Sequence, residues 1–87
     1  MRSRNYIAPP PGATIDEQLS DRGIGRKEFA DRMNMSEKQI NKLINGEAQL
    51  TPEIADRLEL ILGVPARFWN KLESMYRETI SKAEEEE

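Results

Sequence analysis

The sequence contains no cysteine and no histidine. Without thiols the chain can form neither a disulfide framework nor a thiolate zinc site, and without imidazole it lacks the commonest metal ligand and acid–base group. We therefore expect no metal site, no cofactor and no enzymatic activity, and we assign no catalytic residue. Long apolar runs are absent too, since nothing approaches the roughly 20 residues needed to span a bilayer. The N-terminus has no signal-peptide core, so we expect a cytoplasmic protein without membrane contact.

Acidic residues outnumber basic ones, giving a formal net charge of −3 in 87 residues, which is enough chain for one small domain. The charge is unevenly distributed. Residues 22–46 carry six basic and three acidic side chains, whereas residues 47–87 carry five and ten, including the terminal run Glu84–Glu87. A polyanion responds to the local field, so the overall charge does not exclude a nucleic-acid partner.

The first segment, residues 1–13, contains the proline run Ala8–Gly12 and is predicted to be an extended lead-in. Thr14 is a good N-cap, and Glu17 three residues later would complete a capping box. A helix is therefore expected from about Ile15 to Arg22, ending at Gly23.

The next two helices are predicted to be joined by a tight turn. The first runs from Arg26 to Met33, and Asn34 can adopt the left-handed conformation that reverses the chain. Ser36 then caps a third helix, which ends at Asn45-Gly46 and has an apolar stripe made of Ile40, Leu43 and Ile44.

Two further helices complete the prediction. One begins at the Thr51 cap with Pro52 in its first position and ends at Gly63. The other is opened by Pro65 and has apolar residues every three or four positions as far as Ile80. Residues 81–87 form an acidic tail, expected to be a frayed end or the start of a linker. No segment alternates with period two, so the fold class is all-α, with the helical domain spanning residues 14–80.

A tight turn followed by a solvent-facing, amide-rich helix is the helix-turn-helix geometry that places a recognition helix in the DNA major groove. The run GRKEFADRMNMSEKQINKLINGEAQLTPEIADRLELILGVPARFW, residues 25–69, also resembles the lambda-repressor-like (XRE-type) helix-turn-helix domain. Within that family it is most similar to the HigA-type antidotes of toxin–antitoxin addiction modules. The asparagine-glycine after the third helix and the proline-phenylalanine-tryptophan ending carry the resemblance, which covers roughly residues 9–76. It implies a five-helix DNA-binding domain.

The resemblance and the helical geometry together suggest DNA-contacting residues. The candidates for reading base edges are Glu37, Lys38, Gln39, Asn41 and Lys42. Lys38 and Lys42 would donate to guanine, Gln39 and Asn41 could pair with adenine or touch the backbone, and Glu37 could accept from cytosine although it would repel phosphate. The candidates for phosphate contact are Arg26, Lys27, Ser36 and Asn45. The alternative is that this is the solvated face of a surface helix, which the turn, caps and downstream match make the weaker interpretation.

The aromatic residues near the end of the chain fit core packing or a dimer seam better than a ligand site. Phe68, Trp69, Leu72 and Tyr76 are assigned to a dimer interface. The repressors that this chain resembles bind as dimers to two DNA half-sites. We therefore expect a homodimer with the fifth helix near its two-fold axis.

Three functions remain open at this point. The first is a sequence-specific repressor, implied by the resemblance to be an antitoxin that binds an inverted-repeat operator in its own promoter and a cognate toxin. The second is the DNA-binding module of a longer regulator with a metallopeptidase-like domain behind it. The third, and the weakest, is a protein–protein adaptor.

Overall fold

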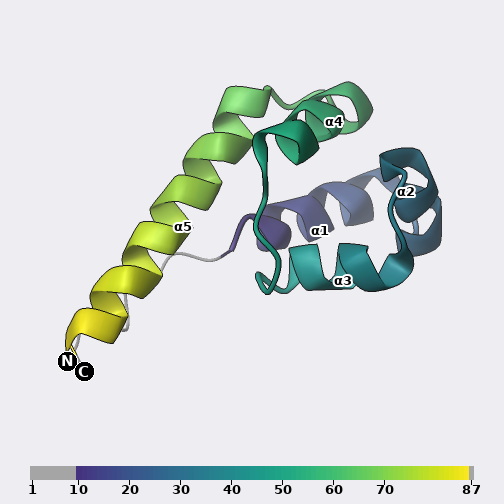
Figure 1. Ribbon diagram of the computed structural model, residues 1–87. Helices are drawn as coiled ribbons and strands as arrows, with labels where there is room; N and C mark the ends of the chain where they lie inside the picture. Colours follow the sequence, from purple (N-terminus) through teal and green to yellow (C-terminus); the bar gives the residue numbers. More distant parts are fainter. Residues whose placement is uncertain (1–9, 87) are drawn as a thin grey trace.

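Residues 10–86, the part of the chain described by this computed structural model, contain five α-helices (Figure 1). They are α1 (Pro11–Arg22), α2 (Arg26–Met33), α3 (Glu37–Ile44), α4 (Pro52–Leu62) and α5 (Ala66–Glu86). No strand occurs within that range, so the predicted five-helix all-α architecture is confirmed. None of these helices is long and apolar enough to cross a bilayer.

The start of α1 differs from the prediction. The helix begins at Pro11, three residues before the expected cap Thr14, and the preceding Pro10 makes no side-chain cap bond. The predicted extended lead-in through residue 13 is therefore wrong for its last three residues, and its first nine lie outside the described range. The reason is that proline lacks only an amide that the first helical turn leaves unbonded anyway, while its fixed φ suits a helix.

The turn between α2 and α3 has the predicted conformation. Asn34 has φ 59° and ψ 44°, in the left-handed region, and the amide of Met35 donates to the carbonyl of Ala30 at 3.0 Å. Ser36 caps α3 by accepting from the amide of Gln39 at 3.1 Å, and the Gln39 side chain accepts from the Ser36 amide at 2.9 Å. These reciprocal bonds satisfy two backbone amides that would otherwise be unpaired at the start of α3.

The last two helices pack against each other, and α5 also contacts α1. Thr51 caps α4 as predicted, and Gly63 ends it with φ 77°. Helix α5 continues to Glu86, so residues 81–86 of the expected acidic tail are helical, and Glu87 lies outside the described residues. The prediction relied on apolar periodicity, whereas alanine, lysine and glutamate prolong a helix by propensity alone.

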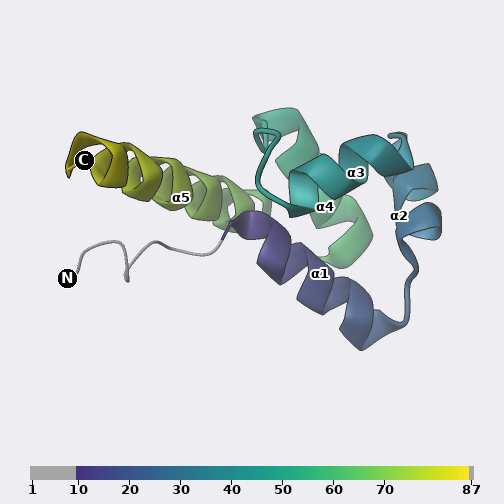
Figure 2. The same ribbon diagram turned by 90° about the horizontal axis from the view of Figure 1, so that it is seen from below.

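One hydrophobic core holds the helices together. Its largest fully buried side chains are Trp69, Phe29, Ile15, Met33, Ile40, Leu58 and Leu62. Figures 1 and 2 show α1 to α4 clustered around this core, with the second half of α5 extending away from the cluster. The placement of Trp69 corrects one assignment: its side chain is 0% exposed and its Nε1 donates to the carbonyl of Val64 at 3.1 Å. Trp69 is thus a core residue with no surface left for a dimer partner.

Candidate nucleic-acid interface

Helix α3 presents one polar face to solvent and buries the other. Its buried residues are Ile40, Leu43 and Ile44, which contact the core shared with α1 and α2. The five residues predicted to read bases are all exposed: Glu37, Lys38, Gln39, Asn41 and Lys42. Lys38 and Lys42 are four residues apart and lie on the side of the helix opposite Ile40. The structure therefore brings these candidates together on one accessible helix, and their roles towards DNA stay predictions.

Arg26, at the first position of α2, connects that helix to both of its neighbours. One guanidinium nitrogen donates to Oδ1 of Asn41 on α3 at 2.6 Å, and another lies 3.3 Å from Oδ1 of Asp16 on α1. The Arg26 and Asp16 side chains are 40% and 55% exposed, so this pair is solvated and contributes little to stability. Its consequence is geometric, because the bonds align the start of α2 with the outer face of α3.

The other predicted phosphate contacts lie around the same surface. Lys27 is exposed beside Arg26 at the start of α2, and Ser36 and Asn45 are exposed at the two ends of α3. The Ser36 oxygen accepts from Gln39, which leaves its hydroxyl hydrogen able to donate. A helix N-terminus also offers unpaired amides and a partial positive charge to an anion. The start of α2 and the start of α3 therefore both suit phosphate contact.

The charges on this surface favour a polyanion. Its cations are Arg26, Lys27, Lys38 and Lys42. Its acids include Glu37 at the first position of α3, where the helix dipole stabilises an anion, and Asp16, whose charge is paired with Arg26. Most of the remaining acidic side chains belong to α4 and α5. The separation explains how a chain with a net negative charge can present a basic face.

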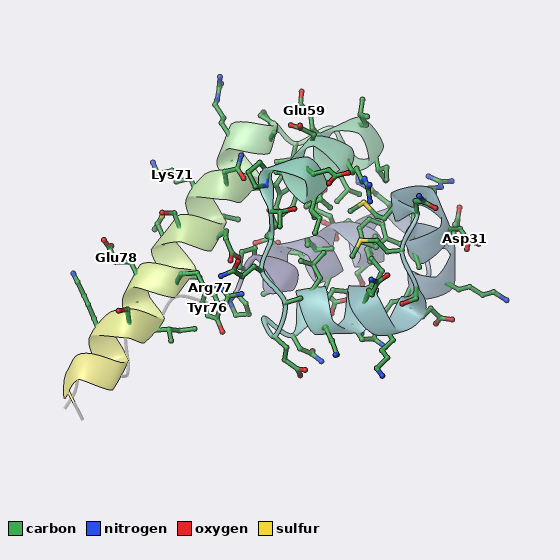
Figure 3. The ribbon with its side chains drawn as sticks, viewed as in Figure 1. Asp31, Glu59, Lys71, Tyr76, Arg77 and Glu78 are labelled. Atoms are coloured by element: carbon green, nitrogen blue, oxygen red, sulfur yellow. The ribbon has the colours of Figure 1, made fainter. Side chains whose placement is uncertain are left out.

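The sequence analysis missed Arg77, which connects α5 to the loop after α3. Its guanidinium donates to the backbone carbonyls of Gly46 and Ala48 at 3.2 and 3.1 Å, and to Glu73 at 2.7 Å. Figure 3 shows Arg77 and Tyr76 on the side of α5 that faces the other helices, whereas Lys71 and Glu78 project from the opposite side. The Glu73–Arg77 spacing signals an ion pair within one helix, but nothing local to α5 signals the loop that it supports.

Comparison with known proteins assigns this arrangement of helices to a family. The HTH_3 family, described as helix-turn-helix, matches residues 19–69, which run from the end of α1 to the start of α5. The chain belongs to the helix-turn-helix family. A relative in Escherichia coli K12, the "Uncharacterized HTH-type transcriptional regulator YddM", is 32% identical over 76 residues, covering 87% of this chain and 79% of the relative.

Two further proteins are similar to this helix-turn-helix chain. The crystal structure of a "putative antidote protein of plasmid maintenance system" from Nostoc punctiforme superposes with a TM-score of 0.76 at 32% identity, covering 87% of this chain and 86% of that one. The "Putative multi-protein-binding factor 1" of Yarrowia lipolytica is 31% identical over 71 residues. That match covers 76% of this chain but only 47% of the longer fungal protein. Helices α2 and α3, with the turn between them, lie inside the family match, which agrees with the lambda-repressor-like fold expected from the sequence.

Proposed function

We propose that this protein is a sequence-specific DNA-binding repressor that inserts the outer face of α3 into the major groove. The observation that carries the proposal is a positioned helix whose inner face is buried and whose outer face combines exposed lysines and amides. The helix-turn-helix family membership and the regulator and antidote descriptions of its relatives support the same function. In this proposal α3 reads bases, while Arg26, Lys27, Ser36 and Asn45 contact phosphates.

The proposal includes a homodimer that binds an inverted repeat. Phe68 and Met75 on α5 are 42% and 47% exposed, and Leu72 between them is partly buried. Their spacing of four and three residues is that of a coiled-coil seam, so two copies of α5 could pair along it. We assign Phe68, Leu72 and Met75 to this seam. Trp69, which the core buries, and Tyr76, which lies on the side of α5 that faces the other helices, are excluded from it. A two-fold axis through α5 would give the operator its symmetry.

The proposal extends to the biological role: a cytoplasmic HigA-type antitoxin that represses its own operon and binds a cognate toxin. The Nostoc structure described as an antidote protein supports this choice over a module of a longer regulator. We expect a small reading frame next to the gene whose product arrests growth when expressed alone. Co-expression of this chain should relieve the arrest and the two proteins should co-purify, whereas a neighbour with no effect on growth would contradict the antitoxin role.

Lys42 and Lys27 are predicted to contribute differently to DNA binding. If Lys42 donates to a base edge, Lys42→Ala should cost about 1 to 3 kcal/mol on the specific site and relax discrimination at one position. Lys27→Ala should weaken binding to specific and random duplexes alike, because a phosphate contact carries no sequence information. Fluorescence anisotropy on both duplexes measures the difference. Equal losses on both duplexes for Lys42→Ala would refute its base-reading role.

The whole proposal is tested with the intergenic duplex upstream of the gene. We expect tight binding to an inverted repeat in that duplex. The logarithm of the affinity should fall linearly with the logarithm of the salt concentration, because counterions are released when the protein neutralises DNA phosphates. A random duplex of equal length and base composition is the control. The repressor function would be abandoned if the protein bound both duplexes equally at every salt concentration.

A further inference from the structure

Two amide side chains on the exposed face of α3 have their oxygen atoms engaged within the protein. Oδ1 of Asn41 accepts from the Arg26 guanidinium at 2.6 Å, and Oε1 of Gln39 accepts from the backbone amide of Ser36 at 2.9 Å. Chemistry fixes the orientation of both amides. A guanidinium and a peptide N–H can only donate, so the amide atom that faces each of them must be the oxygen and not the nitrogen.

The nitrogen ends of these amides are left to face outwards. Among the bonds of the described residues, neither Asn41 Nδ2 nor Gln39 Nε2 donates to another protein group, and both residues are exposed. Each amide therefore offers N–H donors to a ligand while its oxygen is held by the protein. The neighbouring Lys38 and Lys42 also offer only donors. Among the five candidate base-reading side chains, the carboxylate of Glu37 is the one acceptor to which no described residue donates a hydrogen bond.

This inventory matters because the major groove is read by matching donors to acceptors. Guanine presents two adjacent acceptors, N7 and O6, whereas adenine presents one acceptor beside the donating N6 amino group. The bidentate pairing of an amide with adenine needs the amide oxygen to accept from N6 while its nitrogen donates to N7. In Asn41 and Gln39 the oxygen is turned towards Arg26 and Ser36, so that pairing is disfavoured. This geometry therefore argues against the adenine contacts that the sequence suggested for these two residues as one alternative.

We infer that the exposed face of α3 offers hydrogen-bond donors to the bases, with Glu37 as its one acceptor free of a protein donor, and therefore selects a guanine-rich half-site. In that half-site Asn41, Gln39, Lys38 and Lys42 donate to base acceptors, and Glu37 accepts from one cytosine or adenine amino group at the end of α3 nearest the turn. The inference rests on the proposed function, since it takes α3 as the base-reading helix. It adds which bases that helix prefers, and it makes Arg26 a positioning residue that acts on specificity through Asn41.

The test begins with selection of bound duplexes from a randomised library by the full chain. We expect a half-site enriched in guanine, in which replacing the enriched guanines by 7-deazaguanine lowers affinity about tenfold per contacted base. The complementary probe is purine in place of adenine, which removes the N6 amino group. In Glu37→Ala the acceptor without a protein partner is removed, so this change should alter affinity less than about twofold.

A variant that frees the amide oxygen tests the mechanism itself. In Arg26→Met, Oδ1 of Asn41 loses its donor, so we expect the selected site to gain adenine at one position even though total affinity falls. Lys27→Met is the matched control: it removes the adjacent exposed cation but keeps the Arg26–Asn41 bond, so the selected sequence should not change. An unchanged preference in Arg26→Met would overturn the positioning role of Arg26.

The outcomes separate this inference from the proposed function. Selection of an adenine-dependent site, with a large loss on removing N6 amino groups in Glu37→Ala, would overturn the guanine preference of α3 while leaving a sequence-specific repressor. Selection of no sequence at all would overturn the proposed function and the inference with it. A guanine-dependent site that acquires adenine in Arg26→Met supports both.

Discussion

Trp69→Ala is expected to lower the free energy of unfolding by about 3 to 5 kcal/mol, the cost of emptying a large core site. The indole is 0% exposed and bonded to the carbonyl of Val64, and its ring meets Phe68 edge-on with 5.7 Å between centroids. The substitution therefore removes the largest buried side chain, at the junction of α4 and α5. Urea unfolding followed by circular dichroism measures the loss.

Phe68→Ala is the matched control, one residue earlier on α5. Its side chain is 42% exposed, so the variant should lose about 1 kcal/mol or less of monomer stability. It should instead shift the monomer–dimer equilibrium towards monomer in sedimentation experiments. The assignment of Trp69 to the core would be refuted if Trp69→Ala dissociated a dimer while leaving the monomer as stable as before.

Gly12→Ala is expected to cost about 3 kcal/mol, the upper end of the usual range for overpacking. Gly12 lies in the first turn of α1, and a Cβ added there would collide with the backbone of Ile44 at the end of α3. Backbone cannot rotate aside as a flexible side chain can, so α1 would have to move off α3. Thermal and urea unfolding of the variant measure the cost.

Gly25→Ala provides the comparison for that prediction. Gly25 has φ −76°, which any residue adopts, and a Cβ there would meet nothing within 4 Å. As an N-cap change it should cost less than about 1 kcal/mol. Equal stability of Gly12→Ala and wild type would contradict the close approach of α1 and α3.

Local signals were sufficient where a helix end is set by its own residues. Four residues mark the end of α2, the start of α3 and both ends of α4, because capping and left-handed conformations depend on nearby backbone groups: Asn34, Ser36, Thr51 and Gly63. The start of α1 was misjudged because the prolines were interpreted as helix breakers although Pro11 occupies a permitted first position.

Some features of the candidate site also follow from local sequence and others do not. The exposed face of α3 follows from the 3.6-residue period and could be predicted, whereas the partners of its side chains could not. Asp16 meets Arg26, and Arg77 meets the loop after α3, across separations that only the packing of α1 and α5 on their neighbours decides. The burial of Trp69 also depends on how α5 docks, since a stripe on one helix does not say which residues face the core.

The central claim is that the outer face of α3 contacts DNA. Titrating the isotope-labelled protein with its upstream duplex and following backbone amide shifts by nuclear magnetic resonance tests it most directly. We expect the largest changes at Lys38, Lys42 and Arg26, and none on the outer face of α4 around Leu60, which is 86% exposed and so equally open to a ligand. Shifts centred on Leu60, with the α3 amides unchanged at saturation, would contradict the account.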